Sequence, residues 1–136
     1  MKHELEAQRE FAVPDTPDIS GIYGVVFWEE EGELGGGLVQ RNVTVFADGE
    51  VDRSPCGSGT SARLALLHAR GQLEPGRELI HRSIVGTEFR GRVVEETEVN
   101  GRPAVVTEIE GDAHLTGTHE FVLEPDDPLG TGFLLR

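Results

Sequence analysis

The feature that most constrains this chain is a glycine-rich turn at residues 52–62 (DRSPCGSGTSA), which lies between a predicted strand and a predicted helix. The turn contains the only cysteine of the sequence, Cys56. A thiol placed just before a helix lies beside unpaired backbone N–H groups at the positive end of the helix dipole, where a thiolate is favoured. The turn therefore indicates a reactive site that the other elements must hold in place.

Alternating apolar residues predict strands on both sides of this turn. The predicted strands cover residues 19–28, 38–46, 50–52, 78–85, 89–99, 102–109 and 113–123. The dipeptide Asn100-Gly101 between two of them is a strong signal for a tight hairpin. Residues 29–37 are acidic and glycine-rich and predict a flexible surface loop, although three consecutive glycines can also cover a ligand.

One helix is predicted at residues 62–70, capped by Thr60 or Ser61 at its start and by Gly71 at its end. Apolar residues occupy nearly every face, so we expect this helix to be buried all round. The fold class is then α/β of the α+β kind, a mostly antiparallel curved sheet wrapped around one central helix. Residues 1–18 are expected to form a short helix or tail and a proline-containing loop.

The turn offers contacts for both charged ends of an α-amino acid. The backbone N–H groups of Gly57 and Ser58 can hold a carboxylate, and Asp52 can receive an ammonium group. Cys56 would then lie where a thiolate can remove the α-proton, while the charge spreads into the carboxylate. This chemistry needs no metal and no cofactor. Inversion of the centre requires a second acid on the opposite face, and the sequence has no second cysteine.

Other interpretations of the turn are weaker. The sequence GSGTSA (residues 57–62) fits a loose dinucleotide-binding fingerprint, but that fold needs repeated βαβ units. A cysteine–histidine hydrolase needs an oriented histidine, and no histidine is singled out by its position. The histidines and Cys56 show no tight metal-ligand spacing. A purely structural cysteine remains the plain alternative.

The charge balance bears on partners and location. The chain has 12 basic and 25 acidic residues and a net charge of −13, which argues against binding to nucleic acid or to anionic membranes. The only lysine is Lys2, and such an acidic surface suits a high-salt cytoplasm or simply an acidic protein. The charged N-terminus does not resemble a signal peptide, and a lone cysteine fits a reducing compartment. We expect a cytoplasmic protein with no membrane segment.

The turn and its surroundings resemble the proline racemase family, which includes 4-hydroxyproline epimerases. The sequence DRSPCGSGTSAR (residues 52–63) is similar to the family's second catalytic motif. Other similar segments are ISGIYGVVF (19–27), NVTVFADGEV (42–51), SIVGTEFRGRV (83–93), GDAHLTG (111–117) and DPLGTGF (127–133). The resemblance covers nearly the whole chain from about Val13.

This resemblance implies a diaminopimelate-epimerase-like fold, in which two similar halves enclose the active site and two cysteines act as base and acid. It implies that Cys56 is one catalytic cysteine, that Asp52 contacts the substrate nitrogen, and that Gly57 and Ser58 contact the carboxylate. Related 3-hydroxyproline dehydratases usually have threonine where this chain has Cys56, which favours a racemase or epimerase. Ser58 stands where threonine is usual in the family.

The family's first half, with its Cys-Gly-His motif, is not part of this sequence. Residues 19–136 are therefore expected to be a C-terminal catalytic half that acts on proline or hydroxyproline, without a cofactor. We expect it to need a second chain or a homodimer partner and to be inactive alone. The alternative is a non-catalytic amino-acid-binding or structural remnant of such an enzyme.

Overall fold

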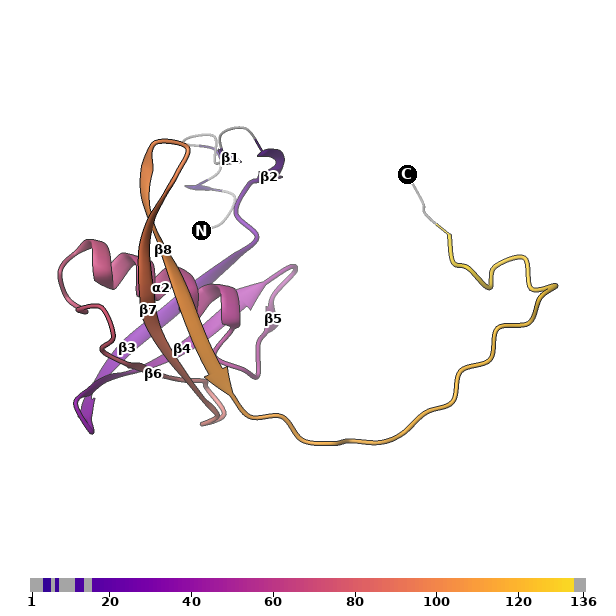
Figure 1. Ribbon diagram of the computed structural model, residues 1–136. Helices are drawn as coiled ribbons and strands as arrows, with labels where there is room; N and C mark the ends of the chain where they lie inside the picture. Colours follow the sequence, from indigo (N-terminus) through magenta and orange to yellow (C-terminus); the bar gives the residue numbers. More distant parts are fainter. Residues whose placement is uncertain (1–3, 6, 8–11, 14–15, 134–136) are drawn as a thin grey trace.

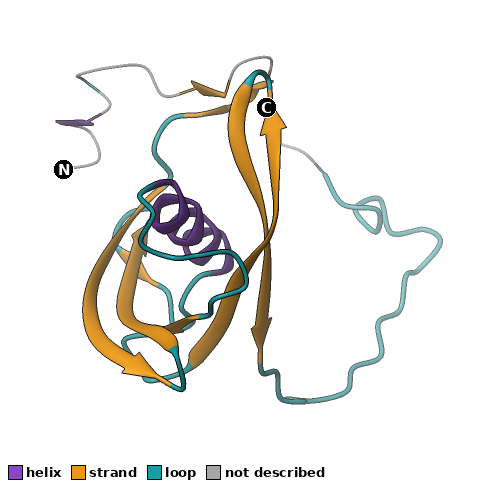
Figure 2. Cartoon of the chain, turned by 60° about the vertical axis from the view of Figure 1, so that its left-hand side comes forward, coloured by secondary structure: helices purple, strands orange, loops and turns teal. Residues whose placement is uncertain are grey.

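The computed structural model describes residues 4, 5, 7, 12, 13 and 16–133. Helix α2 (Gly57–Ala69) lies in the hollow of a curved sheet (Figures 1 and 2). The strands are β1 (Ala12–Val13), β2 (Thr16–Ser20), β3 (Gly24–Leu34), β4 (Gly37–Phe46), β5 (Glu50–Val51), β6 (Leu79–Arg82), β7 (Glu88–Val99) and β8 (Arg102–Gly111). The predicted α+β class, with a curved sheet around one helix, is confirmed. No helix in the described residues is both long and apolar enough to cross a bilayer.

The sheet has the order β3-β4-β6-β7-β8, and β5 also pairs with β4. Its pairings are antiparallel except for β4 with β6, which run parallel with Leu38 opposite Leu79. A parallel pair needs a crossover connection, and α2 lies in that connection. The connection from β4 to β6, which contains the turn and α2, therefore crosses one face of the sheet.

Two tight hairpins build the long arms of the sheet. Asn100 and Gly101 have φ values of 52° and 72°, so both central residues adopt the left-handed conformation of the predicted turn. Gly35 and Gly36, with φ values of 60° and 87°, make a second two-residue turn between β3 and β4. The prediction of a flexible loop at residues 29–37 is wrong, because most of this stretch belongs to β3.

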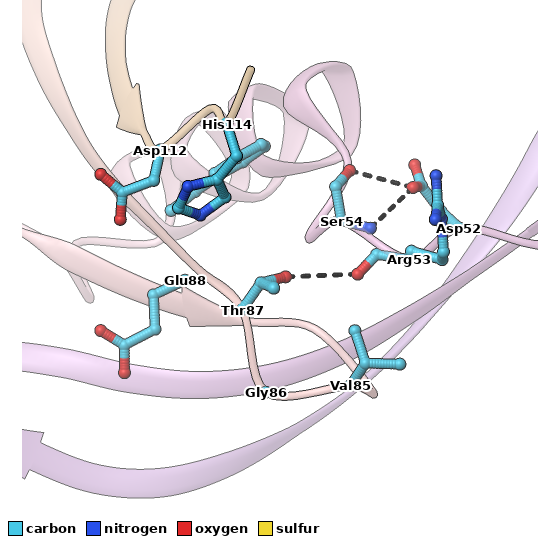
Figure 3. A pocket seen from close by; sticks show the side chains of 10 residues that line it. Asp52, Arg53, Ser54, Val85, Gly86, Thr87, Glu88, Asp112 and His114 are labelled. Atoms are coloured by element: carbon cyan, nitrogen blue, oxygen red, sulfur yellow. Dashed lines mark hydrogen bonds between the residues drawn. The ribbon is translucent and has the colours of Figure 1, made fainter. Parts of the chain in front are cut away.

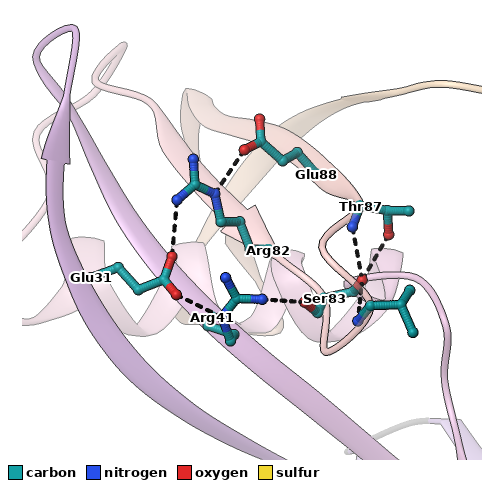
Figure 4. Close-up of polar contacts among 7 residues, drawn as sticks. Glu31, Arg41, Arg82, Ser83, Thr87 and Glu88 are labelled. Carbon is teal, nitrogen blue, oxygen red and sulfur yellow. Dashed lines mark hydrogen bonds and ion pairs between the residues drawn. The ribbon is translucent and has the colours of Figure 1, made fainter.

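The acidic residues of β3 are tolerated in a strand because arginines of neighbouring elements pair with them. Glu31 accepts hydrogen bonds from Arg41 Nε at 2.6 Å and from Arg82 Nη1 at 3.0 Å, as Figure 4 shows. Arg82 Nε also donates to Glu88 at 2.7 Å. The two arginines lower the pKa of Glu31 below its ordinary value. One network thus ties together β3, β4, β6 and β7.

The hydrophobic core lies between α2 and the sheet. Its buried residues are Leu38, Leu64, Leu67, Leu73, Leu79 and Val93, with Val105 and Ile109 packed against them. Gly91 of β7 lets the helix approach closely, because a Cβ there would lie 2.8 Å from Leu64 Cδ1. The expectation that the helix is buried all round is wrong, since Leu66 is exposed on the face turned away from the core.

The helix begins earlier than predicted. It starts at Gly57 with Cys56 as its N-cap, whereas Thr60 or Ser61 was expected there. Thr60 instead uses its hydroxyl below the turn, where it donates to the Pro55 carbonyl at 3.2 Å. The predicted end of the helix is confirmed, because Gly71 follows the helix with a φ of 65°.

Three further strand expectations differ from the structure. Residues 19–28 are not one strand, because the chain breaks at residues 21–23 between β2 and β3. The expected N-terminal loop contains a strand, since Thr16–Ser20 pairs with Ala12–Val13, while most of residues 1–11 lies outside the described residues. Residues 113–123 run as an extended segment without strand pairing.

Candidate functional site

Cys56 occupies a restrained position at the start of α2. Its φ and ψ are 63° and 115°, which is unusual for a residue with a side chain. Its Sγ accepts a hydrogen bond from Gly59 N at 3.4 Å and lies 3.5 Å from Ser58 Oγ. Its carbonyl accepts the first helical hydrogen bond, from Thr60 N at 2.8 Å. The thiol is therefore held against the first turn of the helix, as the sequence predicts.

Asp52 is linked to Cys56 through Ser54. Asp52 Oδ1 accepts from Ser54 N at 2.8 Å and from Ser54 Oγ at 2.9 Å. Ser54 Oγ in turn accepts from Cys56 N at 3.0 Å. Both bonds to Asp52 use Oδ1, which leaves Oδ2 able to accept from a ligand.

A cavity of about 560 Å³ opens beside the thiol. It is lined by Gly21, Ile22, Tyr23, Gly24, Val26, Thr44, Phe46, Asp52, Cys56, Ser58, Gly59 and Ala62. The structure thus brings Asp52, Cys56 and Ser58 together at one cavity. Gly57 is exposed and does not line it, although it directly precedes Ser58 in the first turn.

Sequence reasoning missed the aromatic wall of this cavity. The rings of Tyr23 and Phe46 stack with centroids 6.0 Å apart and an interplanar angle of 23°. Gly24, the first residue of β3, pairs with Phe46, the last residue of β4, which brings Tyr23 close to that ring. The sequence signal was present only as one aromatic residue in the middle of the predicted strand 19–28 and another at the end of the predicted strand 38–46.

A second cavity, of about 690 Å³, lies on the other side of the turn. Figure 3 shows Asp52, Arg53 and Ser54 on one side of it and the residues around Thr87 on another, with Asp112 and His114 near the end of β8. Thr87 Oγ1 donates to the Arg53 carbonyl at 3.2 Å, which braces the turn. This cavity is the larger one, but Cys56 does not line it, so the thiol chemistry belongs to the smaller cavity.

A buried polar layer supports the turn from below. Asn42 Nδ2 donates to the Pro55 carbonyl at 3.0 Å and lies 2.7 Å from His81 Nε2. Because the amide nitrogen can only donate, His81 Nε2 accepts, and the Nδ1 proton is directed at Thr60 Oγ1, 2.9 Å away. Burial, with a further contribution from Arg63, lowers the pKa of His81 to about 4. His81 is therefore neutral at physiological pH.

Arg63 extends this layer along the helix. Its Nε donates to Gln40 Oε1 at 2.8 Å, and its guanidinium carbon lies 3.5 Å from the centroid of the Trp28 ring. Burial lowers the pKa of Arg63 from its ordinary value. The stacking on Trp28 compensates part of the cost of burying this charge.

No grouping of three or more histidine, cysteine, aspartate or glutamate side chains in the described part of the chain is arranged to hold a metal ion. The chemistry that the site offers is carried by a thiol, a carboxylate and backbone N–H groups. These groups can hold and deprotonate a small zwitterion.

Comparison with protein families gives a match over residues 1–134 to the family described as "Proline racemase". A trans-3-hydroxy-L-proline dehydratase of Bacillus cereus is 46% identical over 135 residues, which cover 99% of this chain and 40% of that protein. A proline racemase of Clostridioides difficile is 52% identical over 96 residues, which cover 71% of this chain and 29% of that protein.

Solved structures agree with these matches. A hydroxyproline epimerase from Agrobacterium vitis, with bound trans-4-hydroxy-L-proline, superposes with a TM-score of 0.75 and 42% identity. The superposition covers 98% of this chain and 38% of that chain. The chain therefore spans less than half the length of the relatives that it matches.

Proposed function

The chain belongs to the proline racemase family, and from this premise we propose that it supplies one acid–base thiol, Cys56, to an amino-acid isomerase. The proposed substrates are proline or hydroxyproline, and the proposed reaction is proton transfer at the α-carbon. The observation that carries this proposal is the meeting of Cys56, Asp52 and Ser58 at one cavity by a helix N-terminus.

Each end of the substrate has a proposed contact. Asp52 Oδ2 accepts from the secondary ammonium group, while Ser54 holds Oδ1 in place. The amide N–H groups of Gly57 and Ser58 belong to the open first turn of α2 and hold the carboxylate. The stacked rings of Tyr23 and Phe46 provide an apolar wall for the pyrrolidine ring.

The proton transfer then follows from this placement. The Cys56 thiolate takes the α-proton and becomes a thiol, while the electron pair of the broken C–H bond is delocalised into the carboxylate. The N–H groups that hold the carboxylate stabilise this developing charge. A second acid must return a proton from the opposite face, so the chain alone does not invert the centre. No cofactor is required in this scheme.

We further propose that residues 19–136 form one half of a two-half, diaminopimelate-epimerase-like enzyme. The second half would supply the opposing acid and is either a second chain or another part of a longer protein. Support comes from the share of each relative that the chain matches, about 40% of the Bacillus cereus protein.

A second candidate reaction is the dehydration of 3-hydroxyproline. Relatives that are 46–48% identical carry that name, among them the proteins of Bacillus cereus and Burkholderia ambifaria. In that reaction the Cys56 thiolate would take the α-proton, the electron pair of the C–H bond would form a carbon–carbon double bond, and the 3-hydroxyl group would leave as water with the proton returned from the Cys56 thiol. Cys56 favours epimerisation, because the turn around it resembles the racemase motif and related dehydratases usually have threonine at this position. The products of the reaction distinguish epimerisation from dehydration.

The test combines this chain with the unmatched part of the Bacillus cereus relative. Proline, trans-4-hydroxy-L-proline and trans-3-hydroxy-L-proline are each incubated in deuterium oxide, and NMR measures α-deuteration, inversion and loss of water. We expect α-deuterated, inverted proline or 4-hydroxyproline, and no exchange with the near-isosteric Cys56→Ser. Asp52→Asn should weaken substrate binding, whereas Asp48→Asn, in the preceding turn, is the matched control.

Three results would contradict the proposal in different ways. Inversion by the isolated chain would show that no second half is needed. Hydroxyproline binding without any exchange would indicate an amino-acid-binding remnant. Absence of both binding and exchange would indicate a structural remnant.

A further inference from the structure

We infer that Thr87 is a positioning residue for Asp52, the carboxylate that is proposed to receive the ammonium group of the substrate. Thr87 acts through the peptide group that joins Arg53 to Ser54 and does not itself touch the substrate. This role rests on the proposed function, which gives the ammonium group to Asp52. It adds to that function by naming what keeps the carboxylate turned towards a ligand.

The peptide group between Arg53 and Ser54 is held at both of its ends. Its carbonyl, which belongs to Arg53, accepts from Thr87 Oγ1 at 3.2 Å. Its N–H, which belongs to Ser54, donates to Asp52 Oδ1 at 2.8 Å, and Figure 3 shows both bonds. Because a trans peptide group is planar, its C=O and N–H point in opposite directions. A donor that fixes the carbonyl therefore also aims the N–H at Asp52.

The hydroxyl protons around Thr87 have one consistent arrangement. Ser83 Oγ accepts from the N–H groups of Val85 at 3.3 Å and of Thr87 at 3.2 Å, so both of its acceptor positions are filled (Figure 4). Its own proton is then donated to Thr87 Oγ1, 2.8 Å away. The Thr87 proton cannot go to Ser83 and is directed at the Arg53 carbonyl. The Thr87 hydroxyl is thus held with its proton on the turn.

The loop that carries Thr87, residues 83–87 between β6 and β7, is itself tied down. Ser83 is fully buried. Its N–H donates to the Thr87 carbonyl at 2.8 Å, and its carbonyl accepts from Gly86 N at 3.0 Å and from Arg41 Nη1 at 2.9 Å. Arg41 in turn donates to Glu31 of β3. The hydroxyl of Thr87 is therefore presented from a loop that is anchored to the sheet.

Thr87 and the thiol lie on different sides of Asp52. Asp52 lines both cavities, whereas Thr87 lines the one of about 690 Å³ and Cys56 lines the one of about 560 Å³. The peptide group of Cys56 is held by other residues, since the carbonyl of Pro55 accepts from Asn42 Nδ2 at 3.0 Å. Loss of the Thr87 hydroxyl should therefore act on Asp52 and on substrate binding more than on the thiol.

The first part of the test measures amide hydrogen exchange by NMR on the full chain. Thr87→Val removes the hydroxyl and keeps the branched shape, and it should speed exchange of the Ser54 amide by about 3–10-fold, as expected for one hydrogen bond. Thr87→Ser restores the hydroxyl and should return the rate to within about twofold of the wild type. Thr97→Val, the same change at an exposed position of β7, is the matched control and should leave the Ser54 amide unchanged. The amides of β8 should be unaffected in all three variants.

The second part measures kinetics with the chain mixed with the unmatched part of the Bacillus cereus relative. Thr87→Val should raise KM for proline or hydroxyproline by about 3–10-fold and change kcat by about twofold or less. The reason is that the ammonium group is bound equally in the ground state and in the transition state. A general loosening of the fold would instead lower kcat as well and speed exchange in β8.

Three results overturn this role of Thr87: a Ser54 amide that exchanges in Thr87→Val as in the wild type, a failure of Thr87→Ser to restore the rate, or a fall in kcat at constant KM. The expected exchange rates in a mixture that never exchanges the α-proton of proline or hydroxyproline would support the placement of Asp52 by Thr87 and contradict the proposed function. An active mixture with an unchanged Ser54 amide would do the reverse.

Discussion

At the scale of single residues, the conformation of Cys56 is the most informative detail. A φ of 63° in a residue with a Cβ stores strain, and such strain gathers at functional sites. Neighbours on three sides enforce it: Ser54 Oγ binds its N–H, Thr60 N binds its carbonyl, and Gly59 N binds its Sγ. A Cβ on Gly59 would lie 3.3 Å from the sulfur, so glycine keeps that contact open.

This strain predicts an order of stability between two variants. The free energy of unfolding of Cys56→Gly should exceed that of Cys56→Ala by about 1 kcal/mol, because glycine adopts a positive φ without steric cost. Urea unfolding of both proteins measures the difference. Equal stability, or a more stable alanine variant, would show that the positive φ is not strained.

His81 predicts an acid-dependent loss of stability. Its folded-state pKa of about 4 lies below the ordinary value of 6.5, because the buried ring is held neutral. The stabilisation is therefore fully present above about pH 6.5 and is lost as the pH falls towards about 4, amounting to about 3 kcal/mol at most.

NMR titration of the ring protons reads the His81 pKa directly, and urea midpoints across the same range read its effect on stability. His114→Gln is the matched control, because it removes an exposed histidine and leaves His81 in place. A titration of His81 near pH 6.5 would contradict the buried neutral ring.

Part of the site can be predicted from local sequence and part cannot. Cys56, Asp52 and Ser58 lie within seven residues, so the turn itself brings them together, although their roles remain proposals. Tyr23, Phe46 and His81 reach the site only through strand pairing. No local pattern distinguishes His81 from the exposed His114.

At the scale of elements, the contact of α2 with β7 depends on one residue without a side chain. Gly91→Ala would place a methyl group 2.8 Å from Leu64 Cδ1 and 3.4 Å from Thr60 Cγ2, both on buried residues that cannot move aside freely. We expect a loss of about 1–3 kcal/mol in the free energy of unfolding. Glu98→Ala, exposed on the same strand, should stay within about 0.5 kcal/mol in the same denaturant series. A wild-type-like Gly91→Ala would show that the helix can shift without cost.

The hairpins show which element predictions succeed. Asn100-Gly101 fixes its turn through local backbone preferences, so β7 and β8 were found close to their true bounds. Residues 29–34 were predicted to form a loop, because a run of glutamates disfavours a strand in isolation. Arginines from β4 and β6 reverse that preference, and these are long-range pairs.

The prediction of a strand at residues 113–123 is wrong in the opposite direction, because the structure has no strand there. Alternating apolar residues favour a strand locally, but a strand also needs a neighbour for its backbone groups. Among the described residues no such neighbour is present.

At the scale of the whole molecule, self-repulsion and ion pairing act in opposite directions. The net charge of −13 disfavours the compact state, whereas networks such as Glu31 with Arg41 and Arg82 favour it. Because acidic residues outnumber basic ones by 25 to 12, repulsion should dominate.

The melting temperature should therefore rise as sodium chloride increases from about 0.01 M to about 1 M, since the screening length falls from about 30 Å to about 3 Å. Differential scanning calorimetry at neutral pH measures the trend. A melting temperature that falls with salt would show that the ion pairs outweigh the repulsion, and it would remove the basis for a high-salt habitat.

The parallel pairing of β4 with β6 has a consequence for the order of folding. Leu38 and Leu79 are neighbours in the sheet, yet β5, the Cys56 turn and all of α2 lie between them in the chain. Closing so long a loop is entropically costly, and contacts of this kind slow folding. His81 of β6 reaches the turn only after this closure, so the support beneath the thiol is completed late, after the local β7–β8 hairpin has had time to form.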